Sequence, residues 1–329
     1  MRAHLLGGIP RAEVQAKAAL FAAHGFDPTD LLIPPDAHYF DFAAPLHRKA
    51  DLKPVIEANA GILDREALIR DTYEGWWQAH ASRTTDLATQ GGNPAALIAL
   101  REQLLASFTQ SIEALGMLDP FQIRGIIALF WNQSRYDFLT VMARGTKGSV
   151  DAWRTSIVTA LEDKTAKESP LDHKLVKFLM GDFVTELAGL GAKKAELEAQ
   201  IKAATAVPEE GEEEADEAEP VDAAQVKLWK KDLTAVKSAL KAKEAQFVAE
   251  IDKAVEGLTP EAAGKLLLDI LHRDMEVILA RYVAAQRTQI AAAFETWWDK
   301  YRVTLTEIET ARAEATDKLA GFLRGLGYV

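Results

Sequence analysis

The sequence predicts an all-α protein with a long antiparallel coiled-coil hairpin and a long C-terminal helix. Three observations support this prediction. Helix-forming residues such as Ala, Leu, Glu and Lys are abundant, and few stretches show the period-two alternation of a strand. Two separate apolar repeats flank one acidic run, as the two arms of a hairpin would. A third apolar repeat continues through the C-terminal region.

Residues 1–62 are predicted to hold an N-terminal helix and an irregular, Pro-rich segment. Prolines interrupt residues 26–54 at positions 28, 34, 35, 45 and 54. Because each proline removes a backbone donor, regular structure is disfavoured there. We therefore expect this segment to lie over its neighbours without forming a regular element.

Residues 63–170 are predicted to form a helical domain. Its helices are expected at 64–88, 94–115, 120–143 and 149–162. Asp64, Asn93 and Asp119 precede three of these helices and are suitable N-caps, and a proline follows each of the last two.

Residues 171–257 are predicted to form the hairpin, because apolar residues recur at helical spacing on both of its arms. Folding the chain back near residue 213 would set Leu187 against Leu240 and Leu197 against Trp229. Between the arms, residues 207–220 hold eight acidic and no basic residues, which is most of the net charge of −11. We expect an acidic disordered loop, either a solvated connector or a tip that is regulatory or mimics DNA.

Residues 258–329 are predicted to form a long C-terminal helical region that starts at Thr259-Pro260 and runs nearly unbroken to Gly325. Its apolar repeat needs cover, either from the rest of the chain or from another chain. The adjacent pairs Trp76-Trp77 and Trp297-Trp298 are open to the same two interpretations. The candidate partner-binding residues are Trp298, Tyr301, Leu305, Ile308, Leu319, Phe322 and Leu326.

Composition excludes several kinds of chemistry. Without cysteine there is no disulfide, thiolate metal site or cysteine nucleophile. The seven histidines show no metal-ligand spacing, and no glycine-rich loop follows an apolar strand. We therefore predict no catalytic, cofactor-binding or metal-binding residue. No apolar run reaches a membrane span and the N-terminus is not a secretory signal, so a cytoplasmic protein is expected.

The second hairpin arm carries a series of lysines with few acids among them. Such a series could lie along DNA phosphates, or it could be the solvated flank of a coiled coil. The candidate phosphate contacts are Lys227, Lys230, Lys231, Lys237 and Lys241.

Several segments resemble the modification subunit of type I restriction-modification systems. Leu6-Gly7-Gly8-Ile9-Pro10 resembles the segment that leaves the methyltransferase domain in that family. Residues 118–125 (LDPFQIRG), leading to Phe130-Trp131, are similar to a helix-starting element of the family. Residues 294–301 (FETWWDKY) and 322–328 (FLRGLGY) resemble its final helix.

This resemblance implies a place in an assembly. In that family two modification subunits flank one specificity subunit, and their C-terminal helices bundle with its long helices. The catalytic domain, a site-specific DNA N6-adenine methyltransferase, lies upstream; its Asn-Pro-Pro-aromatic motif is absent here. We thus expect no cofactor in this chain and S-adenosylmethionine in the missing domain. The implied partners are the specificity subunit, DNA through the complex, and as a further candidate the restriction subunit.

A different class of function fits the same helical pattern. The chain could be a stand-alone coiled-coil scaffold that does not act on DNA and whose final apolar repeat closes on itself. Association with a specificity subunit, or its absence, separates the two hypotheses.

Overall fold

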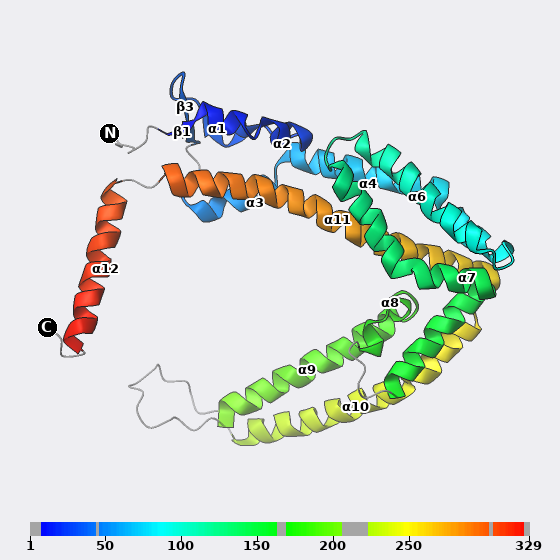
Figure 1. The fold of residues 1–329 in the computed structure, drawn as a ribbon. Coiled ribbons are helices and arrows are strands. Elements are labelled where there is room, and N and C mark those ends of the chain that lie inside the picture. The colour runs from blue at the N-terminus through cyan, green and yellow to red at the C-terminus, as the bar shows by residue number, and fades with distance from the viewer. Residues whose placement is uncertain (1–7, 44–45, 163–168, 206–222, 303–304, 326–329) are drawn as a thin grey trace. The chain divides into compact units, whose positions relative to one another are not determined.

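The computed structural model describes residues 8–43, 46–162, 169–205, 223–302 and 305–325, and helices dominate these ranges (Figure 1). The chain forms two compact units. Unit 1 contains Met1–Ser82, Ile98–Gln133 and Arg273–Val329, and unit 2 contains Arg83–Leu97 and Ser134–His272. The all-α fold class predicted from the sequence is confirmed. None of the described helices is both long enough and apolar enough to cross a membrane.

Residues 26–54, which we expected to be irregular, supply two of the three strands of a small antiparallel sheet in unit 1. Its strands are β1 (Ile9–Pro10), β2 (Leu32–Ile33) and β3 (Tyr39–Phe42), in the order β1-β3-β2. Ile9 lies opposite Phe40. Gly8 has a φ of 98°, and an added Cβ would stand 2.7 Å from the carbonyl oxygen of Phe40. Only glycine fits there without strain, because other residues disfavour this backbone region.

Two groups of buried side chains lie among the helices of unit 1. These helices are α1 (Arg11–Gln15), α2 (Ala18–Ala23), α3 (Leu52–Glu57), α4 (Ala60–His80), most of α6 (Pro94–Glu113), the first part of α7 (Pro120–Glu162) and the later part of α11 (Pro260–Tyr301). Helix α12 (Leu305–Gly325) also belongs to unit 1, and its described side chains are largely exposed. Two short 3-10 turns, η1 (Pro28–Asp30) and η2 (Lys49–Asp51), join the N-terminal elements.

The first group, here called the N-terminal cluster, joins the end of α11 to the first 62 residues. Phe294 is fully buried and its ring lies 5.5 Å from that of Phe26 and 5.8 Å from that of Phe21. Further members are Ile9, Val14, Leu31, Leu32, Phe42, Leu46, Leu52, Ile56, Ile62, Ile290, Trp297 and Tyr301. The N-terminal segment is therefore part of the hydrophobic core.

The second group surrounds the tryptophans of α4. Trp76 packs edge-on against Phe108, with ring centroids 5.0 Å apart, and its indole N–H donates to Ser107 Oγ at 3.0 Å. The ring of Trp77 meets that of Phe130. Both tryptophans are buried, so core packing accounts for the two adjacent rings.

Unit 2 contains the rest of α7 and α11, with the hairpin between them. Its other elements are α5 (Ser82–Asp86), η3 (Leu87–Thr89), η4 (Pro170–Asp172), α8 (Lys174–Leu179), α9 (Gly181–Thr205) and α10 (Ala223–Glu256). The backbone of α7 is kinked at Gly145, which has a φ of 74°, between the two helices predicted at 120–143 and 149–162. Across this kink, the Trp153 indole N–H donates to Asp137 Oδ1 at 2.6 Å.

Helices α9 and α10 lie side by side and antiparallel, as the hairpin prediction requires (Figure 1). Leu187, Leu197, Val236 and Phe247 are buried between elements of this unit. The alignment of the arms differs from the prediction, because Phe183 packs on Phe247. The predicted alignment would have set Phe183 against a residue of the second arm that lies roughly one helical turn before Phe247. The classification of the pair as a coiled coil stays a prediction.

The helix ends agree with the sequence at some positions and not at others. Asn93, Asp119 and Thr259 each accept a backbone N–H of the following turn, as predicted. The prediction of Asp64 as a cap was wrong, because Asn59 Oδ1 accepts the N–H of Ile62 and starts α4 earlier. The C-terminal region is helical over α11, which ends at Tyr301, and over α12, which begins at Leu305 and ends at Gly325.

Replacing Phe294 with alanine should destabilise the protein by about 3–5 kcal/mol, because it removes a fully buried ring and leaves a cavity. Urea unfolding followed by circular dichroism measures this loss. Phe121→Ala is the matched control, since the Phe121 ring is 82% exposed and its loss should change stability by less than about 0.5 kcal/mol. Equal effects of the two substitutions would contradict this description of the core.

Candidate functional site

The end of α11 carries the first two predicted partner-binding residues, and both contact the chain's own N-terminal segment. The Trp298 ring lies 4.9 Å from that of Phe42, and the Arg302 guanidinium stacks over Trp298 at 5.4 Å. Tyr301 is 8% exposed and belongs to the N-terminal cluster. Tyr301 is therefore buried within unit 1, whereas Trp298 is half-buried against the same segment.

Glu13 of α1 is the polar centre of this contact. Its Oε1 accepts the Tyr301 hydroxyl at 2.5 Å and lies 2.6 Å from Lys300 Nζ. The hydrogen bonds from Lys300 and Tyr301 hold the pKa of Glu13 below its ordinary value. Burial, together with the hydrogen bond to Glu13, raises the pKa of Tyr301. A second ion pair, Lys49 with Asp299 at 2.6 Å, ties α11 to η2.

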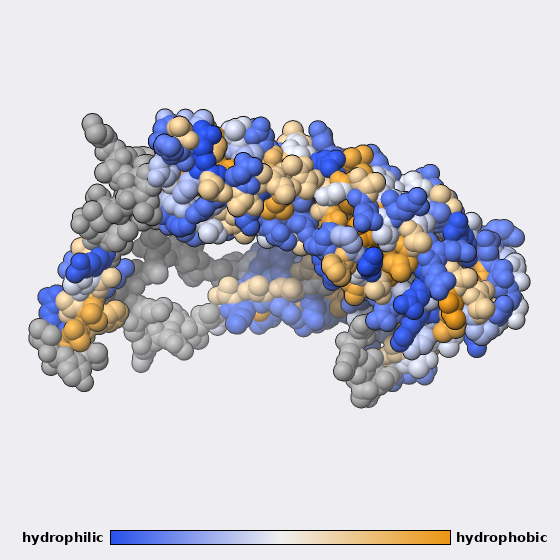
Figure 2. Space-filling model, turned by 45° about the horizontal axis from the view of Figure 1, so that its top comes forward, coloured by the Kyte–Doolittle hydropathy of each residue, from blue (hydrophilic) through white to orange (hydrophobic). Residues whose placement is uncertain are grey.

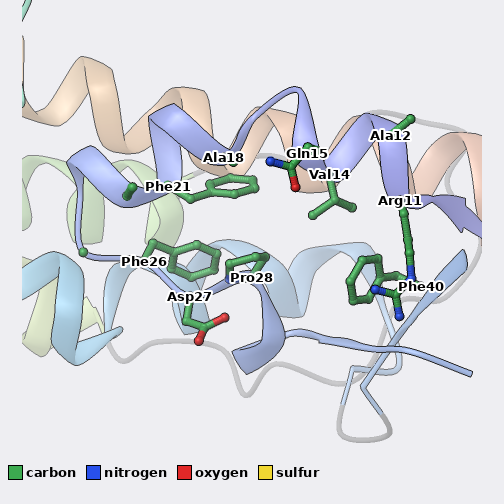
Figure 3. A pocket seen from close by; sticks show the side chains of 12 residues that line it. Arg11, Ala12, Val14, Gln15, Ala18, Phe21, Phe26, Asp27, Pro28 and Phe40 are labelled. Carbon is green, nitrogen blue, oxygen red and sulfur yellow. The ribbon is translucent and has the colours of Figure 1, made fainter. Parts of the chain in front are cut away.

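A groove of about 690 Å³ lies between α1, α2 and the segment that follows them (Figure 3). Its walls include Val14, Phe21 and Phe26, whose side chains are buried members of the N-terminal cluster. Arg11 stands at one end with its guanidinium 4.7 Å from the ring centroid of Phe40. Asp27 lies toward the other end, and hydrogen bonds from Thr29 lower its pKa.

Apolar side chains make up more of the groove's walls than polar ones, and the charged side chains of Arg11 and Asp27 flank them. No local pattern in the sequence predicts this groove, because it forms only when β1 pairs with β3, which lies about thirty residues later in the chain.

Helix α12 carries four of the other predicted partner-binding residues, Leu305, Ile308, Leu319 and Phe322. Leu319 and Phe322 are exposed, at 58% and 71% of their surface. In Figure 2 an orange, apolar patch lies on one side of this helix. The side chains of Leu305 and Ile308, and the whole of Leu326, lie outside the described residues. At 100° per residue, Leu319 and Phe322 share one face with Ala315.

The predicted phosphate-binding lysines are solvent-exposed along α10. Lys227, Lys230, Lys231 and Lys241 are exposed, and Lys237 forms an ion pair with Glu198 at 2.8 Å. The neighbouring Lys243 is half-buried, pairs with Glu186 and lies over the ring of Phe183. The lysines thus divide into an exposed series and one residue that belongs to the contact between α9 and α10.

A second, smaller cavity of about 250 Å³ lies between α4 and α11 in unit 1. Its two carboxylates are engaged in ion pairs, Glu66 with Arg287 at 2.9 Å and Glu276 with Arg273 at 2.6 Å. Burial raises the pKa of Tyr73, which lines the same cavity, so its hydroxyl stays protonated. Among the described residues no group of three or more His, Cys, Asp or Glu side chains could hold a metal ion.

Comparison with known proteins found no matching family model, no similar curated protein and no similar solved structure.

Replacing Glu13 with glutamine should destabilise the protein at pH 7 by about 0.5–1.5 kcal/mol, because it removes the charged acceptor of Tyr301 and Lys300. The folded state lowers the pKa of Glu13 below 4.5, so its carboxylate stabilises the fold above that pH and loses the effect as the pH falls. The difference between wild type and variant should therefore shrink between pH 6 and pH 3, roughly.

Urea unfolding over this pH range tests the prediction. Glu57→Gln is the control, because the Glu57 carboxylate is 4.0 Å from Lys53 Nζ and 44% exposed. A constant difference at all pH values, or the same behaviour in the control, would refute the role given to Glu13.

Proposed function

We propose that this chain is the C-terminal helical assembly and DNA-clamping region of a type I restriction-modification DNA N6-adenine methyltransferase subunit. In this proposal it docks the specificity subunit through α12 and does not transfer a methyl group by itself. S-adenosylmethionine would bind in a catalytic domain outside this chain. Such a complex acts on chromosomal DNA, so we expect it in the cytoplasm, with the restriction subunit as a further candidate partner.

The arrangement of the segments that resemble this family supports the proposal. Ile9 and Phe294 come from two of these segments, and both belong to the N-terminal cluster. The segment that begins at Leu118 provides Asp119, the N-cap of α7. Three of the resembling segments therefore have a definite structural role in unit 1, as expected if they belong to one inherited module.

The exposed apolar face of α12 is the observation that carries the proposal. Each large apolar side chain that leaves water on docking contributes about 1.5–3 kcal/mol, so Leu319 and Phe322 together could supply several kcal/mol. Their spacing of three residues is typical of a helix that packs against another helix. A long helix of the specificity subunit is the partner that the family resemblance implies.

The same face supports a second candidate function. Two copies of α12 could pack on each other, and the chain would then be a coiled-coil scaffold without a role on DNA. Sedimentation of the purified chain separates these cases. A stable dimer with no affinity for a specificity subunit favours the scaffold, whereas a monomer that binds the subunit favours the proposal.

Replacing both Leu319 and Phe322 with serine should weaken association with the cognate specificity subunit at least ~100-fold, because two apolar anchors are lost. The control carries Asp317→Ser and Arg324→Ser, which introduce the same residue at two exposed positions on the opposite face of α12. Co-purification and titration calorimetry measure the effect. The assignment of this face is wrong if both double variants bind as tightly as the wild type.

A further inference from the structure

We propose that the exposed lysines of α10 form a binding site for the phosphate backbone of duplex DNA. This inference rests on the proposed function and deepens it, because it names the residues of unit 2 that would contact DNA. The site, here called the lysine face, consists of Lys227, Lys230, Lys231, Lys237 and Lys241.

The helical geometry of α10 places these lysines on one strip. At 100° per residue they fall within an arc of roughly 120°, and at 1.5 Å per residue they extend over about 21 Å. Over about 21 Å of its axis, duplex DNA carries about twelve phosphates on its two strands, at 1.7 Å per phosphate. The ammonium groups of the strip can therefore reach phosphates of both strands along one side of the duplex.

The strip is separate from the packing surface of α10. The buried Val236 and Phe247 lie on the side of the helix that faces α9. Asp232 is the one carboxylate that α10 contributes between residues 223 and 243, and it lies about 160° away from the centre of the lysine face. From α9, Glu198 pairs with Lys237, and this ion pair lowers the pKa of Glu198. One lysine of the five is thus shared with a carboxylate.

The residues between the lysines favour a duplex over other polyanions. Thr234 and Ser238 occupy the remaining central positions of the strip, and both are exposed. The strip therefore offers no apolar side chains to insert into a lipid layer, as interfacial helices do. It also lacks an aromatic ring on which unpaired bases could stack, since Trp229 is half-buried toward the packing side. Charge and hydroxyl groups without rings suit the outside of a double helix.

The test measures binding of the full chain to a fluorescent duplex of mixed sequence, by anisotropy at several salt concentrations. We expect a Kd in the range of about 10⁻⁴–10⁻⁶ M, with a logarithm that depends linearly on that of the salt concentration. The variant Lys230→Gln, Lys231→Gln, Lys241→Gln should lower the steepness of this dependence by about 2.7, since each phosphate contact contributes about 0.9. Glutamine keeps the helix propensity close to that of lysine.

The control variant carries Lys53→Gln, Lys177→Gln and Lys265→Gln, which remove the same charge from exposed lysines outside the lysine face. Equal loss of binding in both variants would mean that net charge alone drives it, and would overturn the proposal. So would tighter binding to single-stranded DNA or to vesicles of anionic lipid than to the duplex.

The two proposals fail in distinguishable ways. If the lysine face is wrong, the triple variant binds DNA like the wild type while α12 still binds the specificity subunit. If the docking role of α12 is wrong, the chain does not bind that subunit, whereas its salt-dependent DNA binding still depends on the lysine face.

Discussion

The packing of the N-terminal segment on the end of α11 is the interaction on which unit 1 depends. Phe294, Trp297 and Tyr301 would be costly to expose, and the first 62 residues supply the side chains that cover them. Glu13 sets the register of this contact, because its carboxylate accepts hydrogen bonds from both Lys300 and Tyr301. A short sheet and a few helical turns provide this cover, because their apolar residues pack against the end of α11.

The two C-terminal helices differ in whether the rest of the chain covers their apolar residues. The end of α11 has its apolar residues inside the fold, whereas α12 presents Leu319 and Phe322 to solvent. Apolar residues therefore pack inside the fold at the end of α11 and are exposed to solvent on α12. In unit 2, α10 has two different sides. The side that packs on α9 is buried, and the lysine face is exposed to solvent.

Several helix caps could be predicted from the sequence, whereas the contacts of the N-terminal segment with α11 could not. Asn93 and Asp119 were identifiable as caps because a cap acts on the next turn of the same chain. The bond between Glu13 and Tyr301 joins residues 288 positions apart, and no spacing rule connects them. The alignment of α9 with α10 was misplaced because repeats rich in Leu and Ala match almost equally well after a shift of one turn. Of the predicted partner-binding residues, Trp298 and Tyr301 contact the N-terminal segment of the same chain.

The central claim is that the apolar face of α12 is exposed in the free chain and covered by the specificity subunit. Hydrogen–deuterium exchange of the chain, alone and with that subunit, tests it most directly. We predict that amides of α12 exchange rapidly in the free chain and become protected in the complex, whereas those at the end of α11 are protected in both. Protection of α12 that does not change on addition of the subunit would contradict the account.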